Sequence, residues 1–246
     1  MTVRDWFADV AGRRELPTDA MSALETRGFA VLPGLISPEH MRPLVEAYDA
    51  AFASASGDDV RVGSTSTKVS NLLARGRVFE EIFVLPPLLE ACCRVIGAPF
   101  KLSSYIARTV RVGASSQELH VDVRRESADW PLVGFILMVD DFRADNGATR
   151  FVPGSHLAID TPEASMPNRL AAHERQTLAR GSAGSLLVFN GSVWHGHTAN
   201  TSTAPRRSVQ GAFIPRGGRA ATDFASQVSP ETRARLSPVA RDVLGF

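Results

Sequence analysis

This chain has few cysteines, almost no net charge and no long apolar run. Its 246 residues include two cysteines, the adjacent pair Cys92 and Cys93. Adjacent cysteines rarely pair, so the sequence excludes a disulfide framework and favours a reducing compartment; we expect the cytoplasm. The 27 basic and 26 acidic residues leave a net charge of +1, without the basic excess typical of nucleic-acid binding.

Apolar runs are short throughout, and none approaches the length of a membrane span. The first seven residues, MTVRDWF, lack the uninterrupted apolar core of a signal peptide. We therefore expect a soluble monomer or homodimer whose partner is a small molecule, with no nucleic acid and no membrane involved.

The order of sequence patterns predicts a single domain over residues 1–246. Residues 1–99 are expected to be mostly helical and to pack on a β-rich core at 100–216, with 217–246 as an extension. Apolar residues recur at three- and four-residue steps in 18–26 and 38–53, the pattern of helices that lie on a sheet. Residues 78–96 predict a helix pair interrupted at 85–87.

Two details of the second helix are specific. Ser37 before Pro38 predicts an N-cap, whereas Pro43 predicts a kink or a helix that begins later. Residues 55–67 are rich in Ser, Gly and Asp and predict a loop, for which the role of a mobile lid stays open.

Short runs rich in β-branched and apolar residues alternate with turn signals after residue 100. Many short strands at such spacing favour a sandwich or barrel over a parallel α/β sheet. Expected strands span 105–112, 132–139, 148–152, 185–189 and 209–214.

His120-Val121-Asp122 is the most informative motif. Side chains two apart on an extended segment face the same way, so an imidazole and a carboxylate would lie together. His195 follows seventy-three residues after Asp122, shortly after an apolar run. Two histidines and one carboxylate form the triad of non-haem Fe(II) oxygenases, which leaves metal positions open for a co-substrate and O₂.

Four ordered segments resemble the phytanoyl-CoA dioxygenase group of Fe(II)/2-oxoglutarate-dependent oxygenases. They are RGFAVLPGLI at 27–36, His120-Val121-Asp122, DNGATRFVPGSH at 145–156, and WHGHTANTS at 194–202 followed by Arg206. The resemblance covers most of the chain. It implies a mainly β fold with flanking helices, the double-stranded β-helix (a jelly-roll, cupin-like barrel), and Fe(II), 2-oxoglutarate and O₂ as cofactor and co-substrates.

The resemblance also implies roles for residues near His195. The family's metal histidine is followed by Gly, with Asn five and Arg eleven residues later, which selects His195 over His197 and points to Arg206. A guanidinium grips a carboxylate through paired hydrogen bonds, so Arg206 is expected to bind the far carboxylate of 2-oxoglutarate, with Arg207 as the alternative.

Other polar residues are weaker candidates. Thr149 and Thr198 are candidates for hydroxyl contacts to 2-oxoglutarate. Substrate contact is expected from Arg124, Arg125, Trp130 and His197, with the arginines suited to an anionic group. His156 and Asn200 are expected to be structural, and His173 to be solvated.

The implied reaction couples decarboxylation of 2-oxoglutarate to oxidation of a substrate C–H bond, releasing succinate and CO₂. Because Asp122 is retained, hydroxylation, desaturation or ring closure is favoured over halogenation. Two alternatives remain open: a cupin-type metalloprotein that does not use 2-oxoglutarate, and a catalytically silent barrel that serves as a binding module.

Overall fold

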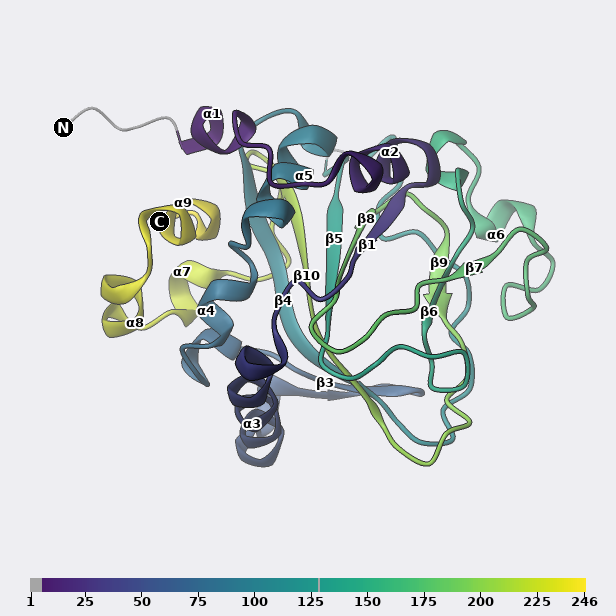
Figure 1. Cartoon of the computed structure of the whole chain (residues 1–246), viewed down its shortest axis with the longest axis horizontal. Coiled ribbons are helices and arrows are strands. Elements are labelled where there is room, and N and C mark those ends of the chain that lie inside the picture. The colour runs from purple at the N-terminus through teal and green to yellow at the C-terminus, as the bar shows by residue number, and fades with distance from the viewer. Residues whose placement is uncertain (1–5, 128) are drawn as a thin grey trace.

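Two antiparallel β-sheets face each other, and helices cover the outer face of the larger one (Figure 1). The computed structural model describes residues 6–127 and 129–246. The larger sheet has the order β1-β8-β5-β10-β4-β3-β2 and the smaller β7-β6-β9. The strands are β1 (Phe29–Leu32), β2 (Val60–Val62), β3 (Ser66–Val69), β4 (Phe100–Val110), β5 (Val133–Met138), β6 (Thr149–Phe151), β7 (Thr177–Leu178), β8 (Leu186–Asn190), β9 (His195–His197) and β10 (Arg206–Pro215).

The two faces of the larger sheet contribute to two separate apolar clusters. Outward residues of β4, β5 and β10, including Tyr105, Phe135 and Phe213, pack against the helices. Inward residues of β1, β5 and β8 meet Phe151 of β6 between the sheets, where the Phe29 and Phe151 rings stack 4.3 Å apart. The strand β5 is buried on both faces because it lies in the middle of this arrangement.

The helices begin and end at residues that suit those positions. Proline opens α3 (Pro38–Ser54), α5 (Pro86–Ile96), α8 (Pro230–Arg235) and α9 (Pro238–Leu244), where its missing N–H has no helical partner to lose. The remaining α-helices are α1 (Trp6–Ala11), α2 (Thr18–Arg27), α4 (Phe79–Ile82), α6 (Pro162–Ser165) and α7 (Phe224–Gln227), and short 3₁₀ turns span Gly57–Asp59, Leu72–Ala74 and Ser155–Leu157.

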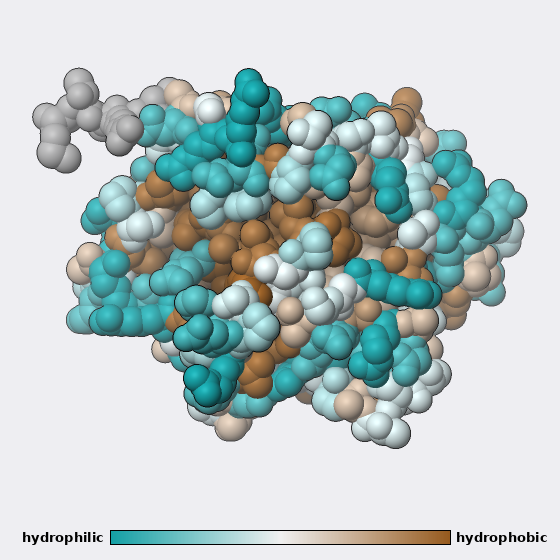
Figure 2. Space-filling view, viewed as in Figure 1, coloured by the Kyte–Doolittle hydropathy of each residue, from teal (hydrophilic) through white to brown (hydrophobic). Residues whose placement is uncertain are grey.

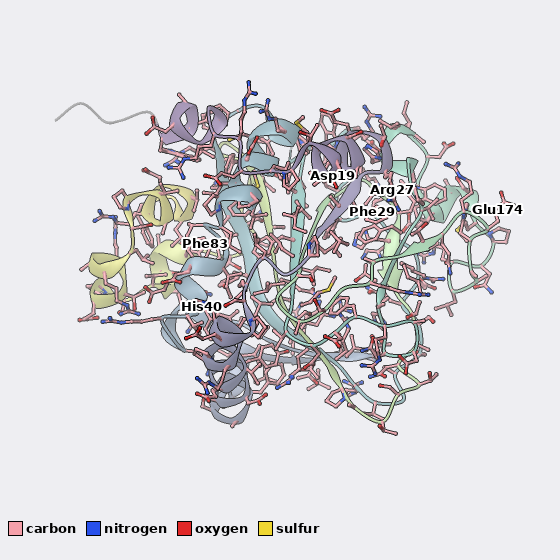
Figure 3. All side chains as sticks on the ribbon, in the orientation of Figure 1. Asp19, Arg27, Phe29, His40, Phe83 and Glu174 are labelled. Carbon is pink, nitrogen blue, oxygen red and sulfur yellow. The ribbon has the colours of Figure 1, made fainter. Side chains whose placement is uncertain are left out.

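Most helices lie on one side of the molecule. In Figure 3, His40 of α3 and Phe83 after α4 mark the helical side, whereas Phe29 of β1 lies toward the smaller sheet. Figure 2 shows apolar side chains gathered near the middle of the same face, between the helices and the strands. A groove of about 600 Å³ is lined by residues of α3, of α4 and of the segment after β1, among them Leu35, Leu44 and Ile82.

The expected helices are confirmed, with two corrections in α3. The helix begins at Pro38 and continues through Pro43, so the later start is wrong. Ser37 occupies the N-cap position but its hydroxyl bonds His40 Nδ1 at 2.8 Å and caps no backbone amide. The pair at 78–96 is present as α4 and α5 on either side of Leu85.

Residues 55–67 are not the plain loop that their composition predicted. They contain a 3₁₀ turn, β2 and the start of β3, and the β2–β3 hairpin extends the larger sheet through pairing of β3 with β4. A polar segment becomes a strand here because an edge strand from elsewhere in the chain offers it backbone partners. The five strand segments expected after residue 100 are confirmed, with β4 and β10 extending beyond their expected starts.

Within the described residues, no helix has the length and apolar character needed to cross a membrane.

Candidate active site

His120, Asp122 and His195 converge between the two sheets. Their ligand atoms all lie within 4.8 Å of one another. His120 Nε2 is 3.8 Å and His195 Nε2 is 3.6 Å from the same oxygen, Asp122 Oδ1. The sequence expectation that these three side chains meet is therefore reproduced in space, although Asp122 lies in a bend and not on a strand.

Backbone pairing holds the three residues in place. His120 and His195 exchange N–H···O bonds of 2.9 and 3.0 Å, as in an isolated antiparallel bridge. The Asp122 amide donates to Gly191 O at 2.8 Å, in the turn between β8 and β9. The Phe151 and Phe189 rings lie 5.7 and 4.8 Å from the His195 ring and restrict its orientation.

The hydrogen bonds of both imidazoles leave the nitrogens that face Asp122 free to bind a metal. Nδ1 of His195 donates to Val193 O at 2.9 Å, and Nδ1 of His120 donates to Glu118 O at 3.0 Å. A neutral imidazole that donates through Nδ1 carries a lone pair on Nε2. Burial and the neighbouring His195 lower the pKa of His120 to about 4, so its ring is neutral at pH 7, as a metal ligand requires.

Arg206 is fully buried and lines the same cavity as His120, Asp122 and His195. It opens β10, its guanidinium lies 4.0 Å over the Phe142 ring, and its Nε and Nη1 have no hydrogen-bond partner among the described residues. Burial and the nearby Arg108 lower the pKa of Arg206 to about 9. A buried cation without an anion is costly, which indicates that the site is built to receive one.

Arg207 points to the other face of β10. It forms ion pairs with Asp140 and Asp49, both at 2.8 Å, which raise its pKa. The alternative assignment to Arg207 therefore loses its geometric basis, because this guanidinium is already paired outside the cavity.

His195 and His197 both face inward on β9, and their partners differ. His197 Nδ1 donates to Thr198 O at 2.8 Å, and its Nε2 accepts the Thr65 hydroxyl at 2.9 Å. Only His195 belongs to the cluster that offers ligand atoms with Asp122. Thr149 lines the cavity, whereas the Thr198 hydroxyl donates to Ala148 O at 3.2 Å.

Two adjoining cavities are lined by these residues and their neighbours. An inner cavity of about 330 Å³ contains the triad, Arg206, Thr149 and His197. An outer cavity of about 560 Å³ opens beside the β2–β3 hairpin. Four residues line both cavities: Lys68, Arg108, Gln117 and His120.

Sequence reasoning missed Lys68, Arg108 and Gln117. Side chains alternate along a strand, so the predicted strand at 105–112 could have identified Arg108 as an inward-facing residue. Lys68 depends on the register Lys68↔Arg108 between β3 and β4, which no local pattern reveals.

The residues expected to contact substrate near the His-x-Asp motif lie elsewhere. Arg125 donates to Leu157 O at 2.9 Å and lies 5.4 Å over the Trp130 ring, while Arg124 is exposed. None of the three lines either cavity. Substrate contact by Arg124, Arg125 or Trp130 therefore stays a prediction.

Three further residues have mainly structural contacts. Asn200 is buried, donates to Ala204 O and accepts from Ser202, so it holds the turn as expected. Buried His156 contacts Glu25 O at 3.1 Å and does not belong to the triad's ligand cluster. His173 is half-buried and its ring lies edge-on to the Trp194 ring, so it is only partly solvated.

Comparison with known proteins identifies the family. The family model described as phytanoyl-CoA dioxygenase (PhyH) matches residues 24–208. The chain belongs to the phytanoyl-CoA dioxygenase family. The matched region extends from the end of α2 into β10 and includes the triad and Arg206.

Several relatives of this phytanoyl-CoA dioxygenase family member carry dioxygenase names. The multifunctional dioxygenase prhA of Penicillium brasilianum is 26% identical over 93% of this chain and 82% of its own length. The dioxygenase cdmA of Talaromyces verruculosus is 25% identical over 78% of this chain and 71% of its own length.

Solved structures with the same fold include two that have 2-oxoglutarate (α-ketoglutarate) bound. HygX of Streptomyces hygroscopicus, with nickel, 2-oxoglutarate and hygromycin B bound, has a TM-score of 0.70 at 16% identity, covering 83% of this chain and 90% of its own. The epimerase SnoN, in complex with Fe³⁺, α-ketoglutarate and nogalamycin RO, has a TM-score of 0.66 at 18% identity, covering 80% and 82%.

The family assignment confirms the expected fold, the double-stranded β-helix. It also establishes the protein as an Fe(II)- and 2-oxoglutarate-dependent dioxygenase that uses O₂. The described residues fit iron and 2-oxoglutarate. Two histidine Nε2 atoms and one carboxylate lie close enough together to bind a single metal ion, and a buried arginine lacks an anionic partner.

Proposed function

We propose that this phytanoyl-CoA dioxygenase family member oxidises a C–H bond of a small-molecule metabolite, with hydroxylation as the reaction. His120, Asp122 and His195 hold Fe(II), and Arg206 binds the far carboxylate of 2-oxoglutarate. In each turnover 2-oxoglutarate is converted to succinate and CO₂. One atom of O₂ enters succinate and the other enters the hydroxylated product.

The observation that carries this proposal is the buried Arg206 guanidinium. Its Nε and Nη1 lack partners in a cavity that also holds the triad. A guanidinium binds a carboxylate through two parallel hydrogen bonds, and such a pair is strong when water is excluded. The dianionic co-substrate supplies the missing charge there and presents its other end to the triad.

The protein's own residues bind, orient and exclude water. When bound, iron supplies the oxidising chemistry that breaks an unactivated C–H bond. Val193 O and Glu118 O fix the imidazole tautomers, and Phe151 and Phe189 hold the His195 ring. The Phe142 ring beneath Arg206 keeps water from one face of the guanidinium. Thr149 lines the inner cavity together with Arg206 and the triad, and we assign its hydroxyl to the co-substrate.

Relatives and structural neighbours support a small-molecule substrate. The name of prhA is that of a multifunctional dioxygenase, and the neighbours HygX and SnoN have hygromycin B and nogalamycin RO bound. The combined inner and outer cavities offer room for such a compound beside the triad.

Oxygen labelling of succinate and product tests the proposal. A panel of metabolites is incubated with the iron-loaded enzyme, 2-oxoglutarate and ¹⁸O₂, and succinate release identifies the substrate. Hydroxylation places one ¹⁸O in succinate and one in the product. Label in succinate alone would indicate desaturation or ring closure, whereas unlabelled or absent succinate would favour a metalloprotein that does not use 2-oxoglutarate or a silent binding module.

A further inference from the structure

Arg150 is a buried cation on the face of β6 that points away from the metal triad. Its neighbours on this strand, Thr149 and Phe151, point between the two sheets, so strand alternation turns Arg150 to the opposite face. The side chain is 3% exposed, and burial lowers its pKa. No carboxylate of the described residues forms an ion pair with it. A buried charge is costly unless other polar groups compensate it.

Backbone carbonyls from two separate segments supply that compensation. Nη2 of Arg150 donates to Gln117 O at 2.8 Å. The other carbonyl acceptors lie in residues 169–171: Arg169 O at 3.0 Å and Leu170 O at 3.3 Å from Nη2, and Ala171 O at 2.9 Å from Nη1. One guanidinium therefore joins the backbone at Gln117 to the backbone at 169–171.

The Arg150 side chain reaches Gln117 by crossing β9 at a glycine. Arg150 is paired with Gly196 in the register of β6 and β9. Gln117 lies on the other side of β9, where its amide donates to His197 O at 2.9 Å. A Cβ at Gly196 would lie 3.0 Å from Gln117 O, the oxygen that Arg150 binds. The absence of a side chain at Gly196 therefore leaves room for this contact.

The backbone that Arg150 holds leads directly to a residue of the triad. Gln117 is three residues before His120, whose amide donates to His195 O at 2.9 Å. Between them, the Leu119 amide donates to Arg169 O at 3.0 Å, the same oxygen that accepts from Arg150 Nη2. Arg150 thus binds Gln117 directly and also binds the carbonyl that holds Leu119.

We propose that Arg150 is a positioning residue of the metal site, which fixes His120 through Gln117 O and Arg169 O. This inference rests on the proposed function, because it takes His120 as a metal ligand. Arg150 itself touches neither the metal nor 2-oxoglutarate. Without the guanidinium, residues 117–120 lose a shared anchor on one side of β9, and His120 Nε2 is held less firmly beside Asp122 and His195.

Metal binding by variants of Arg150 tests the inference. Arg150→Met removes the hydrogen-bond donors and retains a long unbranched side chain. Arg175→Met is the matched control, because Arg175 also donates to a backbone carbonyl, Pro153 O at 3.0 Å, but is exposed. Fe(II) affinity is measured without O₂ by competition with a chelator. The visible absorption of the Co(II)-loaded proteins reports the geometry of the ligands around the metal.

We expect Arg150→Met to weaken Fe(II) binding about tenfold, the lower end of the range for residues that support metal ligands. Its Co(II) spectrum at saturating metal should differ from that of the wild type. Arg175→Met should match the wild type in both measurements. Wild-type affinity and an unchanged spectrum in Arg150→Met would overturn the inference, and so would an equal loss of affinity in Arg175→Met.

Hydrogen–deuterium exchange of the metal-free proteins separates positioning from a general loss of stability. Arg150→Met should exchange faster at residues 117–120, while β5 stays as protected as in the wild type. Exchange that rises equally in β5 and at 117–120 would overturn the inference, because Arg150 would then support only the fold.

Arg150→Lys provides the test if the methionine variant does not fold. Lysine keeps the positive charge but offers one ammonium in place of the planar fork, so it is a poor replacement where two segments are bridged. We expect its Fe(II) affinity to lie between those of the wild type and Arg150→Met. Wild-type affinity together with a wild-type Co(II) spectrum in Arg150→Lys would overturn the inference.

His120→Ala distinguishes failure of this inference from failure of the proposed function. Wild-type Fe(II) affinity in His120→Ala would contradict the proposed function, because His120 would then not be a ligand. Loss of Fe(II) in His120→Ala, with wild-type binding in Arg150→Met, would contradict the role of Arg150 alone.

Discussion

Arg206 is the residue on which recognition of the co-substrate depends. We expect Arg206→Met to raise the KM for 2-oxoglutarate by more than about tenfold, since loss of a buried charge pair costs roughly 2–5 kcal/mol. Methionine fills most of the arginine's volume, so the fold should be retained. Succinate release at varied 2-oxoglutarate concentration measures the effect.

Arg207→Ala is the matched control for that substitution. Arg207 is adjacent in sequence but pairs with Asp140 and Asp49 on the other face of β10. Its loss should leave the KM for 2-oxoglutarate unchanged. If Arg207→Ala raised that KM and Arg206→Met did not, the assignment of the carboxylate-binding arginine would be wrong by one residue.

The two inward histidines of β9 should respond differently to removal. We expect His195→Ala to lose bound iron and all turnover of 2-oxoglutarate, because one of three ligands is gone. His197→Ala should retain iron, since the Nε2 of His197 is occupied by Thr65. Metal analysis of both purified variants decides between them, and the reverse pattern would transfer the metal role to His197.

Individual residues also show what sequence reasoning could reach. Strand alternation places His195 and His197 on the same face and cannot choose between them. The family spacing chose His195, and tertiary partners give the physical reason, because Thr65 from a distant hairpin occupies His197. The position of Lys68 could not be predicted from the sequence for the same reason, because it depends on a strand pairing between distant segments.

At the level of elements, Gly196 permits β9 to approach the segment that carries His120. A Cβ at this position would lie 2.9 Å from Glu118 O and 3.0 Å from Gln117 O, both backbone atoms. We expect Gly196→Ala to displace that segment and to weaken Fe(II) binding by about 10- to 100-fold, the range for supporting residues of a metal site.

Gly217→Ala is the control for the glycine substitution, because a Cβ there meets nothing within 4 Å. Competition with a chelator measures Fe(II) affinity in both variants. Unchanged affinity in Gly196→Ala would show that the His120 segment adjusts without cost.

The β2–β3 hairpin borders the outer cavity. Arg111 donates to Gly63 O at 2.9 Å and also to Ser64 O, which fastens the hairpin tip. We expect Arg111→Ala to increase hydrogen–deuterium exchange over residues 60–69 while β5, in the middle of the sheet, stays protected. Arg143→Ala, at an exposed turn, is the control, and equal exchange in both variants would argue against this role of Arg111.

Elements with strong local patterns were predictable, and those set by distant partners were not. The runs that became β5 and β8 carry enough apolar and β-branched residues to be identified alone. Residues 55–67 have the composition of a loop, and β2 and β3 form there because β4 offers an unpaired edge.

At the scale of the whole molecule, two apolar clusters flank the larger sheet. The polar residues of the active site lie on its inner face. One cluster joins the sheet to helices from both ends of the chain, and the other fills the space between the sheets beside the triad. The rigid sheets thereby hold ligands that come from distant parts of the sequence, as a preorganised site requires.

The most direct test of the account is iron-dependent binding of 2-oxoglutarate in the absence of O₂. Radiolabelled 2-oxoglutarate is equilibrated with the wild-type protein, with and without Fe(II), and with Asp122→Ala. We expect stoichiometric binding to the iron-loaded wild type, and weak binding both without iron and in Asp122→Ala, which loses the anionic ligand. Equally tight binding in Asp122→Ala, or in the wild type without iron, would contradict a shared site for iron and co-substrate at His120, Asp122, His195 and Arg206.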